Sequence, residues 1–285
     1  MAGMRTRKRS RAARVVFALS LVVLIGAVAV LGVFVYSYLQ GQDAYDKVAD
    51  IAFEVPPEVS SGVPPASNDS NEADESQLFT LTVDWDALAA INPDIVGWVY
   101  MPDTAINYPI VRGSNNERYL TYNFNGEHGA DWLPTYGTPF LLAENAADFS
   151  DANNVIQAHN MANGTMFAKI PELMNATEFN AHRKVYVLTP AGNYRLTSIS
   201  MVVSSPNEAI LRVSFDSREE FQSYVQGIID RSVVSPEPAV PSVDEVSKLF
   251  TFSTCTSDNG QYRCVLVCTV TEFEKRTTST ASVAT

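Results

Sequence analysis

The distribution of hydrophobic and polar residues separates an apolar N-terminal run from a globular C-terminal region. Residues 15–39 carry no charge, residues 52–77 contain few large apolar side chains, and apolar blocks return from residue 78. A folded region of about 200 residues is typical of one domain. The pattern predicts a basic tail at 1–14, a transmembrane segment at 15–39, a linker at 40–77, a folded domain at 78–274 and a polar tail at 275–285.

Most apolar blocks of the folded region are short and rich in β-branched and aromatic residues, which is typical of strands. Pro109 lacks a backbone N–H, so its strand is expected at a sheet edge or at a bulge. Many short strands with few helices indicate a mixed β barrel or sandwich rather than alternating βαβ units. The predicted strands are residues 95–101, 105–111, 138–142, 154–158, 184–189, 194–203, 246–253 and 262–270.

Two helices are predicted beside these strands. A short one precedes the first strand, with Asp84 or Asp86 as its N-cap. The other spans residues 217–229, where apolar side chains recur at helical spacing and Ser217 and Glu220 form a capping box.

The uncharged run at residues 15–39 is long enough to cross a membrane. At about 1.5 Å per helical residue it spans roughly 37 Å, more than the hydrocarbon core of a bilayer. A cleaved signal peptide has a shorter apolar region and a small-residue cleavage site, so the run favours an uncleaved anchor. Six basic and no acidic residues precede residue 15. We therefore expect a single-pass protein of the cell membrane, with a cytoplasmic N-terminus and an extracellular folded domain.

The rest of the chain is strongly acidic. The formal net charge is −12 overall, and without the six N-terminal basic residues the remaining 14 basic and 32 acidic residues give −18. This charge argues against nucleic acid as a partner, since binding to phosphates needs a basic footprint. Residues 52–77 are rich in Pro, Ser and acidic residues, so this part of the linker is predicted to be a disordered, solvated tether.

Three cysteines leave at least one thiol without an intramolecular disulfide partner. Cys264 and Cys268 fall in one predicted strand, where four residues at about 3.3 Å each separate their Cα atoms by roughly 13 Å. That separation exceeds the span of a disulfide. No disulfide is therefore expected, and the sequence assigns no role to these two cysteines.

Cys255 ends one predicted strand region, and Arg263 begins the next. A short loop brings these strand ends side by side, so a thiol and a guanidinium can face one site. A thiolate is the reactive nucleophile. Arg stays charged, so it stabilises a thiolate or a developing oxyanion and cannot act as the base. The alternative from spacing alone is a buried inert cysteine beside a surface arginine.

Activation of such a thiol requires a base, and a histidine is expected in this role. The chain has three histidines. His159 follows the apolar run 154–158 and precedes a loop, where a rigid strand can hold a functional side chain. His128 lies in a polar loop and His182 precedes a strand, so both are interpreted as ordinary surface histidines. Apart from one cysteine pair, no histidines or cysteines have zinc-like spacing. Neither a metal nor a cofactor is predicted.

Several motifs in order resemble those of class B sortases, the membrane-anchored cysteine transpeptidases of Gram-positive bacteria. TFSTC at 251–255, followed by Arg263, resembles their Thr-Leu-x-Thr-Cys…Arg signature. AHNM and GTMF within 158–167 are similar to the segment around the sortase histidine, with Phe252 and Ala158 replacing the usual Leu and Gly. The helix at 217–229 matches the one inserted in class B, and further similarity lies in NPDIVGW at 92–98, YPIV at 108–111 and NERYL at 116–120.

This resemblance covers residues 84–270 and implies a closed eight-stranded β barrel with flanking helices, preceded by the membrane helix and the tether. It also implies a transpeptidase that cleaves a C-terminal sorting motif on surface or pilin proteins through a Cys255 thioester. The resemblance implies that His159 is the acid and base. It implies that Arg263 stabilises the oxyanion and positions the substrate. The acceptor is then an amine of a cell-wall peptidoglycan precursor or of a pilin lysine.

The resemblance also implies a substrate groove, and a plain core position is the alternative for Leu120. Two other functions stand beside transpeptidation: a surface cysteine peptidase that hydrolyses the same motif, and an anchored binding module without activity. The intact reactive residues weigh against the binding module. The transpeptidase and the peptidase differ only in whether an amine or water attacks the thioester. The predicted groove residues are Asn116, Leu120, Ile210, Leu211, Ser253 and Thr254.

Overall fold

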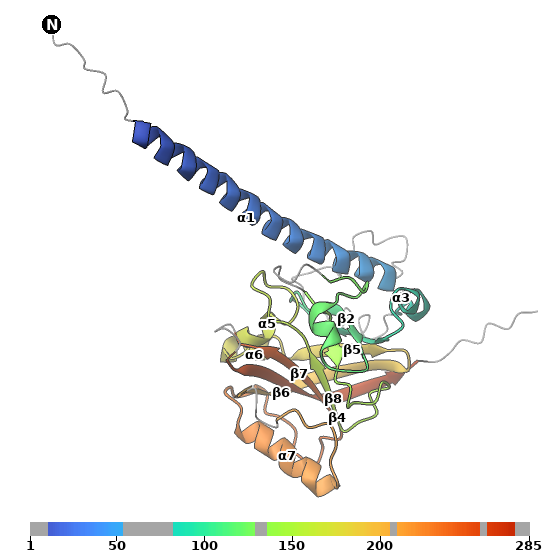
Figure 1. The fold of residues 1–285 in the computed structure, drawn as a ribbon. Coiled ribbons are helices and arrows are strands. Elements are labelled where there is room, and N and C mark those ends of the chain that lie inside the picture. Colours follow the sequence, from blue (N-terminus) through green and yellow to red (C-terminus); the bar gives the residue numbers. More distant parts are fainter. Residues whose placement is uncertain (1–10, 54–81, 129–135, 206–209, 257–260, 277–285) are drawn as a thin grey trace, which may run out of the picture.

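The computed structural model describes residues 11–53, 82–128, 136–205, 210–256 and 261–276. Residues 54–77 of the predicted tether and residues 277–285 of the predicted polar tail lie outside the described residues. The described part consists of one long N-terminal helix and a β barrel with helices on its surface (Figure 1).

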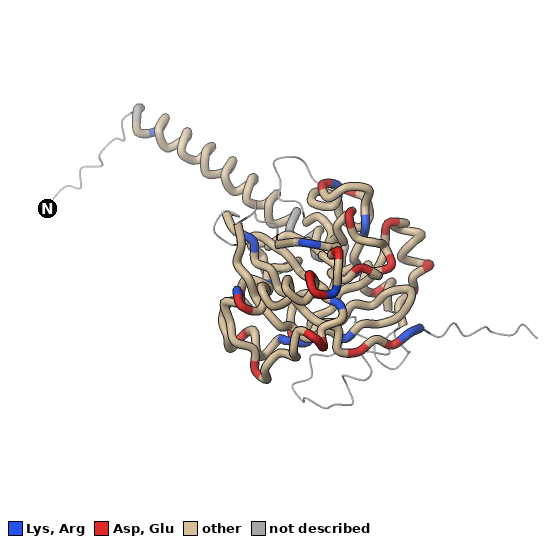
Figure 2. The backbone as a smooth tube through the Cα atoms, turned by 90° about the horizontal axis from the view of Figure 1, so that it is seen from below, with Lys and Arg blue, Asp and Glu red and all other residues tan. Residues whose placement is uncertain are grey.

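The first helix, α1 (Arg11–Ala52), projects from the barrel (Figure 1). Its segment Ala13–Tyr36 has 24 residues, a mean hydropathy of 2.9 and no buried positions, so by length and composition it can cross a membrane. Figure 2 shows this projecting part without charge except near its N-terminal end, whereas Lys, Arg, Asp and Glu are spread over the folded domain.

The structure differs from the expected linker over residues 40–52, which continue α1 without a break. Four apolar side chains of this segment are buried against the barrel, and this burial explains why the helix does not stop at the end of the apolar run. Phe53 then forms an isolated bridge with Val83, and its ring lies 5.3 Å from that of Trp98. The four buried residues are Tyr45, Val48, Ala49 and Ala52.

Eight strands close into a barrel in the order β1-β2-β3-β4-β7-β8-β6-β5, which confirms the expected barrel architecture. The predicted strands are all present, with ends that differ by a few residues. The strands are β1 (Ile95–Tyr100), β2 (Asn107–Val111), β3 (Phe140–Leu141), β4 (Asn153–Gln157), β5 (Lys184–Thr189), β6 (Gly192–Ser204), β7 (Leu249–Cys255) and β8 (Arg263–Lys275).

Pro109 is tolerated because β2 is paired along its length on one side only. It lies opposite Trp98 of β1, while β2 contacts β3 through the single pair Val111 and Phe140. A missing N–H at Pro109 therefore removes no hydrogen bond from a second ladder. The closed barrel that the described residues form has no edge strand, so the expected sheet edge is replaced by a position that is paired on one side only.

Helices α3 (Trp85–Ile91) and α7 (Arg218–Asp230) correspond to the two predicted helices. The cap of α3 is Asp84, which accepts from Ala87 N at 2.9 Å, and Ser217 caps α7 by accepting from Glu220 N at 3.1 Å. The carboxylate of Glu220 accepts from the N–H of residue 216 rather than from that of Ser217, so the capping box is only half formed. Three short helices were not predicted: α4 (Arg118–Thr121), α5 (Lys169–Glu172) and α6 (Ala176–Ala181).

Side chains of β7 and β8 alternate between the main core and a second core under α7. Leu266 and Phe252, which pair across the two strands, belong to the main core. Val265 and Val267 belong to the cluster that contains α7. Phe252, which stands where the family usually has Leu, packs its ring 5.9 Å from that of Phe167.

Candidate active site

Cys255 and Arg263 face each other at the ends of β7 and β8. They form the last pair of this antiparallel ladder, and the next two pairs of the same face are Ser253 with Val265 and Thr251 with Val267. Arg263 Nη1 lies 3.6 Å from Cys255 Sγ, at a hydrogen-bonding contact to sulfur. Both side chains are partly exposed. The strand register therefore places a cation against an accessible thiol.

His159 reaches the same place from β4, which runs parallel to β7. The last residue pair between these strands is Gln157 with Ser253, so His159 and Cys255 each lie two residues beyond it. Neighbouring strands are about 4.8 Å apart, and residues separated by two positions share a face. Asn160 Nδ2 donates to Cys255 O at 3.1 Å, which holds the loop after His159 against the end of β7.

The imidazole of His159 contacts two backbone segments. Its Nε2 lies 2.6 Å from Leu120 O, and because a carbonyl oxygen only accepts, Nε2 carries the proton in this contact. A Cβ on Gly137 would lie 3.2 Å from His159 Cδ2 and 2.5 Å from Tyr119 O. Gly137 also has a φ of +60°, a conformation that favours glycine. A side chain at position 137 would therefore displace the imidazole or its neighbours.

The other two histidines lie on different elements. His128 meets the ring of Tyr122 edge to face, with ring centroids 5.0 Å apart. His182 follows α6, and its Nδ1 lies 2.9 Å from Glu178 O. Within the described ranges, no group of three or more His, Cys, Asp and Glu side chains is arranged to hold a metal ion.

Ser253 and Asn116 differ in how their polar groups are used. Ser253 shares the face of Cys255, and its buried Oγ has no hydrogen-bond partner among the described residues. Asn116 Nδ2 donates to Glu144 Oε2 at 2.8 Å, while its Oδ1 accepts from Ala143 N at 2.7 Å. Ser253 thus keeps an unused hydroxyl near the thiol, whereas Asn116 ties two loops together.

The remaining predicted groove residues differ in burial: two are at least partly exposed and two are buried. Leu120 is exposed and lies beside the imidazole through its carbonyl, so it is not a plain core residue. Leu211 is half-buried at the edge of both cores. In contrast, Ile210 is buried in the cluster under α7, and Thr254 is buried and donates to Ala158 O at 2.8 Å. Thr254 alternates with Cys255 along β7 and therefore points away from the thiol, whereas the cluster that buries Ile210 contains Val265 and Val267 of the Cys255 face.

A family model described as the sortase domain matches residues 99–271, more than half of the chain. The chain belongs to the sortase family. The match contains the thiol, the imidazole and the guanidinium that the barrel brings together.

Individual relatives agree with this assignment and confirm the resemblance to class B. Two proteins named sortase B, from Staphylococcus aureus and Listeria monocytogenes, are 25% and 28% identical to this chain over 171 residues. The match covers 60% of this chain and 67% and 66% of theirs. The crystal structure of sortase B from Bacillus anthracis has a TM-score of 0.64 at 25% identity, covering 84% of this chain and 98% of that one.

The other two cysteines of this sortase are separated from the site. Cys264 and Cys268 are fully buried in the main core, on the face opposite Arg263, and none of the three cysteines forms a disulfide. Burial raises the pKa of Cys268 to about 12, so this thiol stays protonated at neutral pH. Only Cys255 combines access to solvent with a neighbouring cation.

Sequence reasoning missed Gly137 and Asn160, which hold the sortase histidine in place. Gly137 lies in a segment whose only sequence signal is a glycine between a tyrosine and a threonine. Asn160 directly follows the histidine in the matched motif, so that motif could have drawn attention to it. Neither residue carries a reacting group, and their contacts appear only when distant strands meet.

Proposed function

We propose that this chain is a membrane-anchored class B sortase, a cysteine transpeptidase that cleaves a C-terminal sorting motif and joins the product to an amine. The observation that carries the proposal is the 3.6 Å contact between Arg263 Nη1 and Cys255 Sγ, formed at strand ends next to His159. A thiol beside a fixed cation and a histidine is the arrangement that nucleophilic cysteine catalysis needs.

In the first step, the Cys255 thiolate attacks the carbonyl carbon before the scissile bond. The new C–S bond pushes the electron pair onto oxygen, and the Arg263 guanidinium donates hydrogen bonds to that oxyanion. As the oxyanion collapses, the C–N bond breaks and protonated His159 gives its proton to the departing amine. The products of this step are a thioester on Cys255 and a free C-terminal fragment.

In the second step, the acceptor amine attacks the thioester carbonyl. Neutral His159 takes the proton that the amine loses, and Arg263 again stabilises the oxyanion. The C–S bond then breaks, which regenerates the thiolate and leaves a new amide bond. Water in place of the amine gives hydrolysis by the same steps, so the nucleophile alone decides between the two products.

The proposal places substrate over the face shared by Cys255 and Ser253. Leu120 and the half-buried Leu211 supply apolar contact at the rim, while Ser253, whose hydroxyl is buried without a partner in the described part of the chain, lies beneath this face. The partners are surface or pilin proteins that carry the motif and an amine of the cell wall or of a pilin. The apolar segment of α1 anchors the enzyme, with the barrel outside the cell.

Mass spectrometry of the full chain in detergent, incubated with sorting-motif peptides, tests this function. We expect a covalent adduct on Cys255 of the mass of the acyl fragment, and its transfer when triglycine or a peptidoglycan stem peptide is added. The matched control is Cys264→Ser, which removes a buried thiol from the adjacent strand and is expected to retain both the adduct and the transfer.

The outcome separates the candidate functions. Adduct formation followed only by hydrolysis, at every amine concentration, would replace the transpeptidase with a peptidase. No adduct with any peptide, on a chain whose Cys255 reacts with iodoacetamide, would refute the enzyme assignment.

A further inference from the structure

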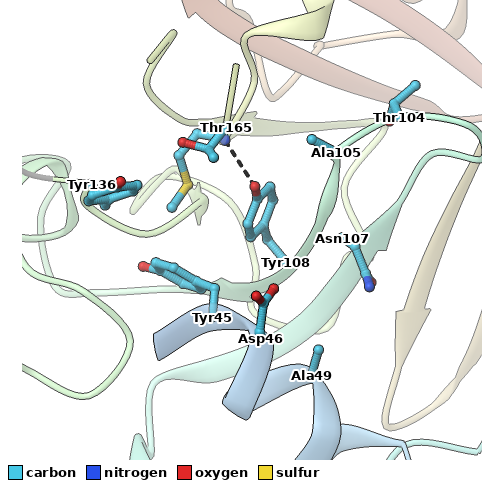
Figure 3. A pocket seen from close by; sticks show the side chains of 10 residues that line it. Tyr45, Asp46, Ala49, Thr104, Ala105, Asn107, Tyr108, Tyr136 and Thr165 are labelled. Carbon is cyan, nitrogen blue, oxygen red and sulfur yellow. Dashed lines mark hydrogen bonds between the residues drawn. The ribbon is translucent and has the colours of Figure 1, made fainter. Parts of the chain in front are cut away.

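The C-terminal part of α1, residues 41–52, packs directly against segments that hold the active-site histidine. A Cβ on Gly41 would lie 2.1 Å from the ring of Tyr136, so only glycine allows this approach of helix and barrel. Figure 3 shows Tyr45, Asp46 and Ala49 of α1 on one side of a cavity of about 160 Å³ whose other walls are barrel residues. Two series of contacts, called routes below, connect the α1 residues at this cavity to His159.

The first route starts at the Tyr45 hydroxyl, which donates to Gly137 O. Gly137 is the residue on which a Cβ would lie 3.2 Å from His159 Cδ2. Tyr45 is 4% exposed, and burial raises the pKa of its hydroxyl well above the ordinary value, so it remains a donor throughout the physiological range. One hydrogen bond therefore separates α1 from the backbone under the imidazole.

Thr138 extends this contact to α4. Its Oγ1 lies 3.1 Å from the Tyr45 hydroxyl and donates to Tyr122 O at 3.0 Å, while its N–H donates to Tyr119 O at 2.9 Å. The carbonyl of Leu120, which contacts His159 Nε2, lies between these two acceptors in the chain. Tyr45 thus supports both backbone surfaces that the imidazole touches.

The second route passes through two tyrosines to the loop that follows His159. The Tyr45 ring meets that of Tyr108 edge to face at 5.5 Å, and the Tyr108 hydroxyl accepts from Met166 N at 3.1 Å (Figure 3). Tyr136, whose ring covers Gly41, accepts from Asn163 Nδ2 at 3.0 Å. Both loop residues lie between His159 and Phe167, whose N–H donates to His159 O.

We propose that Tyr45 is a positioning residue for His159, and that the juxtamembrane part of α1 is a structural component of the active site. The inference deepens the proposed function and rests on His159 being the acid and base. The membrane helix then does more than tether the enzyme, because its docking sets the place of the imidazole. A shift of the helix relative to the barrel moves the general acid with it.

The test compares Tyr45→Phe with wild type in the full chain, in nanodiscs. The substitution keeps the ring packing and removes the hydroxyl that donates to Gly137 O and contacts Thr138 Oγ1. We expect kcat for peptide transfer to fall about 10- to 100-fold with little change in KM, because a misplacement of about 1 Å in a catalytic group has that effect. The ¹⁵N resonances of the His159 imidazole are expected to shift, while those of His182 stay in place.

Ser200→Ala is the matched control. It also removes a buried hydroxyl that donates to a backbone carbonyl, Ile228 O at 2.8 Å, but on the α7 side of the barrel, opposite α1 (Figure 1). We expect it to lower the melting temperature without changing kcat or the His159 resonances. If Ser200→Ala lowers kcat as much as Tyr45→Phe, the effect is general destabilisation and the proposal fails.

A second pair of variants covers the case in which Tyr45→Phe does not fold. Thr138→Val removes the hydroxyl beside Tyr45, and Thr138→Ser keeps it. We expect a lower kcat and a displaced His159 resonance for the valine variant, with recovery in the serine variant. Equal kcat and unchanged His159 resonances in both overturn the proposal. Because the resonances need no turnover, they test the positioning role even if the wild-type chain transfers no peptide.

Discussion

Replacement of Arg263 by lysine separates two ways in which this side chain can act. In the first, it is only a positive charge beside the Cys255 thiolate. In the second, its guanidinium also donates hydrogen bonds in a fixed geometry to the oxyanion and the substrate carbonyl. Arg263→Lys keeps the charge and removes the fork of donors, so the size of the rate loss distinguishes the two roles.

The charge-only role predicts a small loss. At the observed 3.6 Å, a thiolate and a guanidinium attract each other by about 4–5 kcal/mol with an effective dielectric constant of about 20. An ammonium held roughly 5 Å from the sulfur retains about 3 kcal/mol on the same basis. The difference of about 1 kcal/mol corresponds to a rate loss of roughly 5- to 10-fold.

The donor role predicts a larger loss. Removal of one oxyanion donor typically lowers kcat by about 10²–10³, or roughly 3–4 kcal/mol. Nη1 lies toward the sulfur, and within the described residues no partner occupies the rest of the guanidinium, so those N–H groups are available to the substrate oxygen. We therefore expect a fall of about 10²–10³ in kcat/KM for Arg263→Lys, and a larger fall for Arg263→Ala.

The assay pairs peptide cleavage kinetics with the rate at which iodoacetamide alkylates Cys255. We expect the lysine variant to lose turnover while its thiol is alkylated at a near-normal rate, because the charge that favours the thiolate is retained. Turnover within about tenfold of wild type would match the charge-only calculation and refute the donor role. Loss of alkylation together with turnover would show that the substitution acts on the thiol itself.

Three other predictions follow from burial and from the helix. Cys264→Ser and Cys268→Ser are expected to keep most of the activity of the folded enzyme, whereas Cys255→Ala abolishes it; an inactive, well-folded Cys264→Ser would contradict the observed strand faces. N-terminal sequencing of membrane-purified protein should begin close to Met1, and a shortened, secreted form would contradict the anchor. Burial raises the pKa of Tyr108 to about 12, whereas in the unfolded chain its pKa is about 10. The neutral hydroxyl therefore contributes stability that is fully present below a pH of about 10 and is lost as pH rises through about 12. Unfolding in urea from pH 9 upward should show this decline and a shallower one in Tyr108→Phe.

Local sequence pattern was sufficient for most of the secondary structure. Strands appear as β-branched runs and α7 as a helical period with a serine cap, because alternation and capping depend on neighbours within a few residues. The three short helices escaped prediction because four to six residues contain too little periodicity. The end of α1 was missed for a different reason, since residues 40–52 are helical through burial against the barrel.

The residues proposed to react could also be named from the sequence, whereas the residues that hold them in place could not. Cys255, His159 and Arg263 carry chemistry that few residue types provide, and they occur in motifs at strand ends. The face on which each side chain lies required the strand register, which turned Thr254 into the core and left Ser253 beside the thiol. The burial of Ile210 depends on α7 packing over it, which the sequence pattern around residue 210 does not show.

What the sequence determined by itself is the proposed set of reacting groups, the membrane-length helix and the approximate position of each strand along the chain, because each depends on residue chemistry or on short-range pattern. What only the tertiary structure decided is how the histidine is held. Tyr45 and Gly137 are 92 residues apart and meet through one hydrogen bond, and a single such contact leaves no trace in the periodicity of either segment. It forms because closure of the barrel and docking of α1 bury both groups. Buried polar groups are almost always hydrogen-bonded, so the hydroxyl donates to the carbonyl.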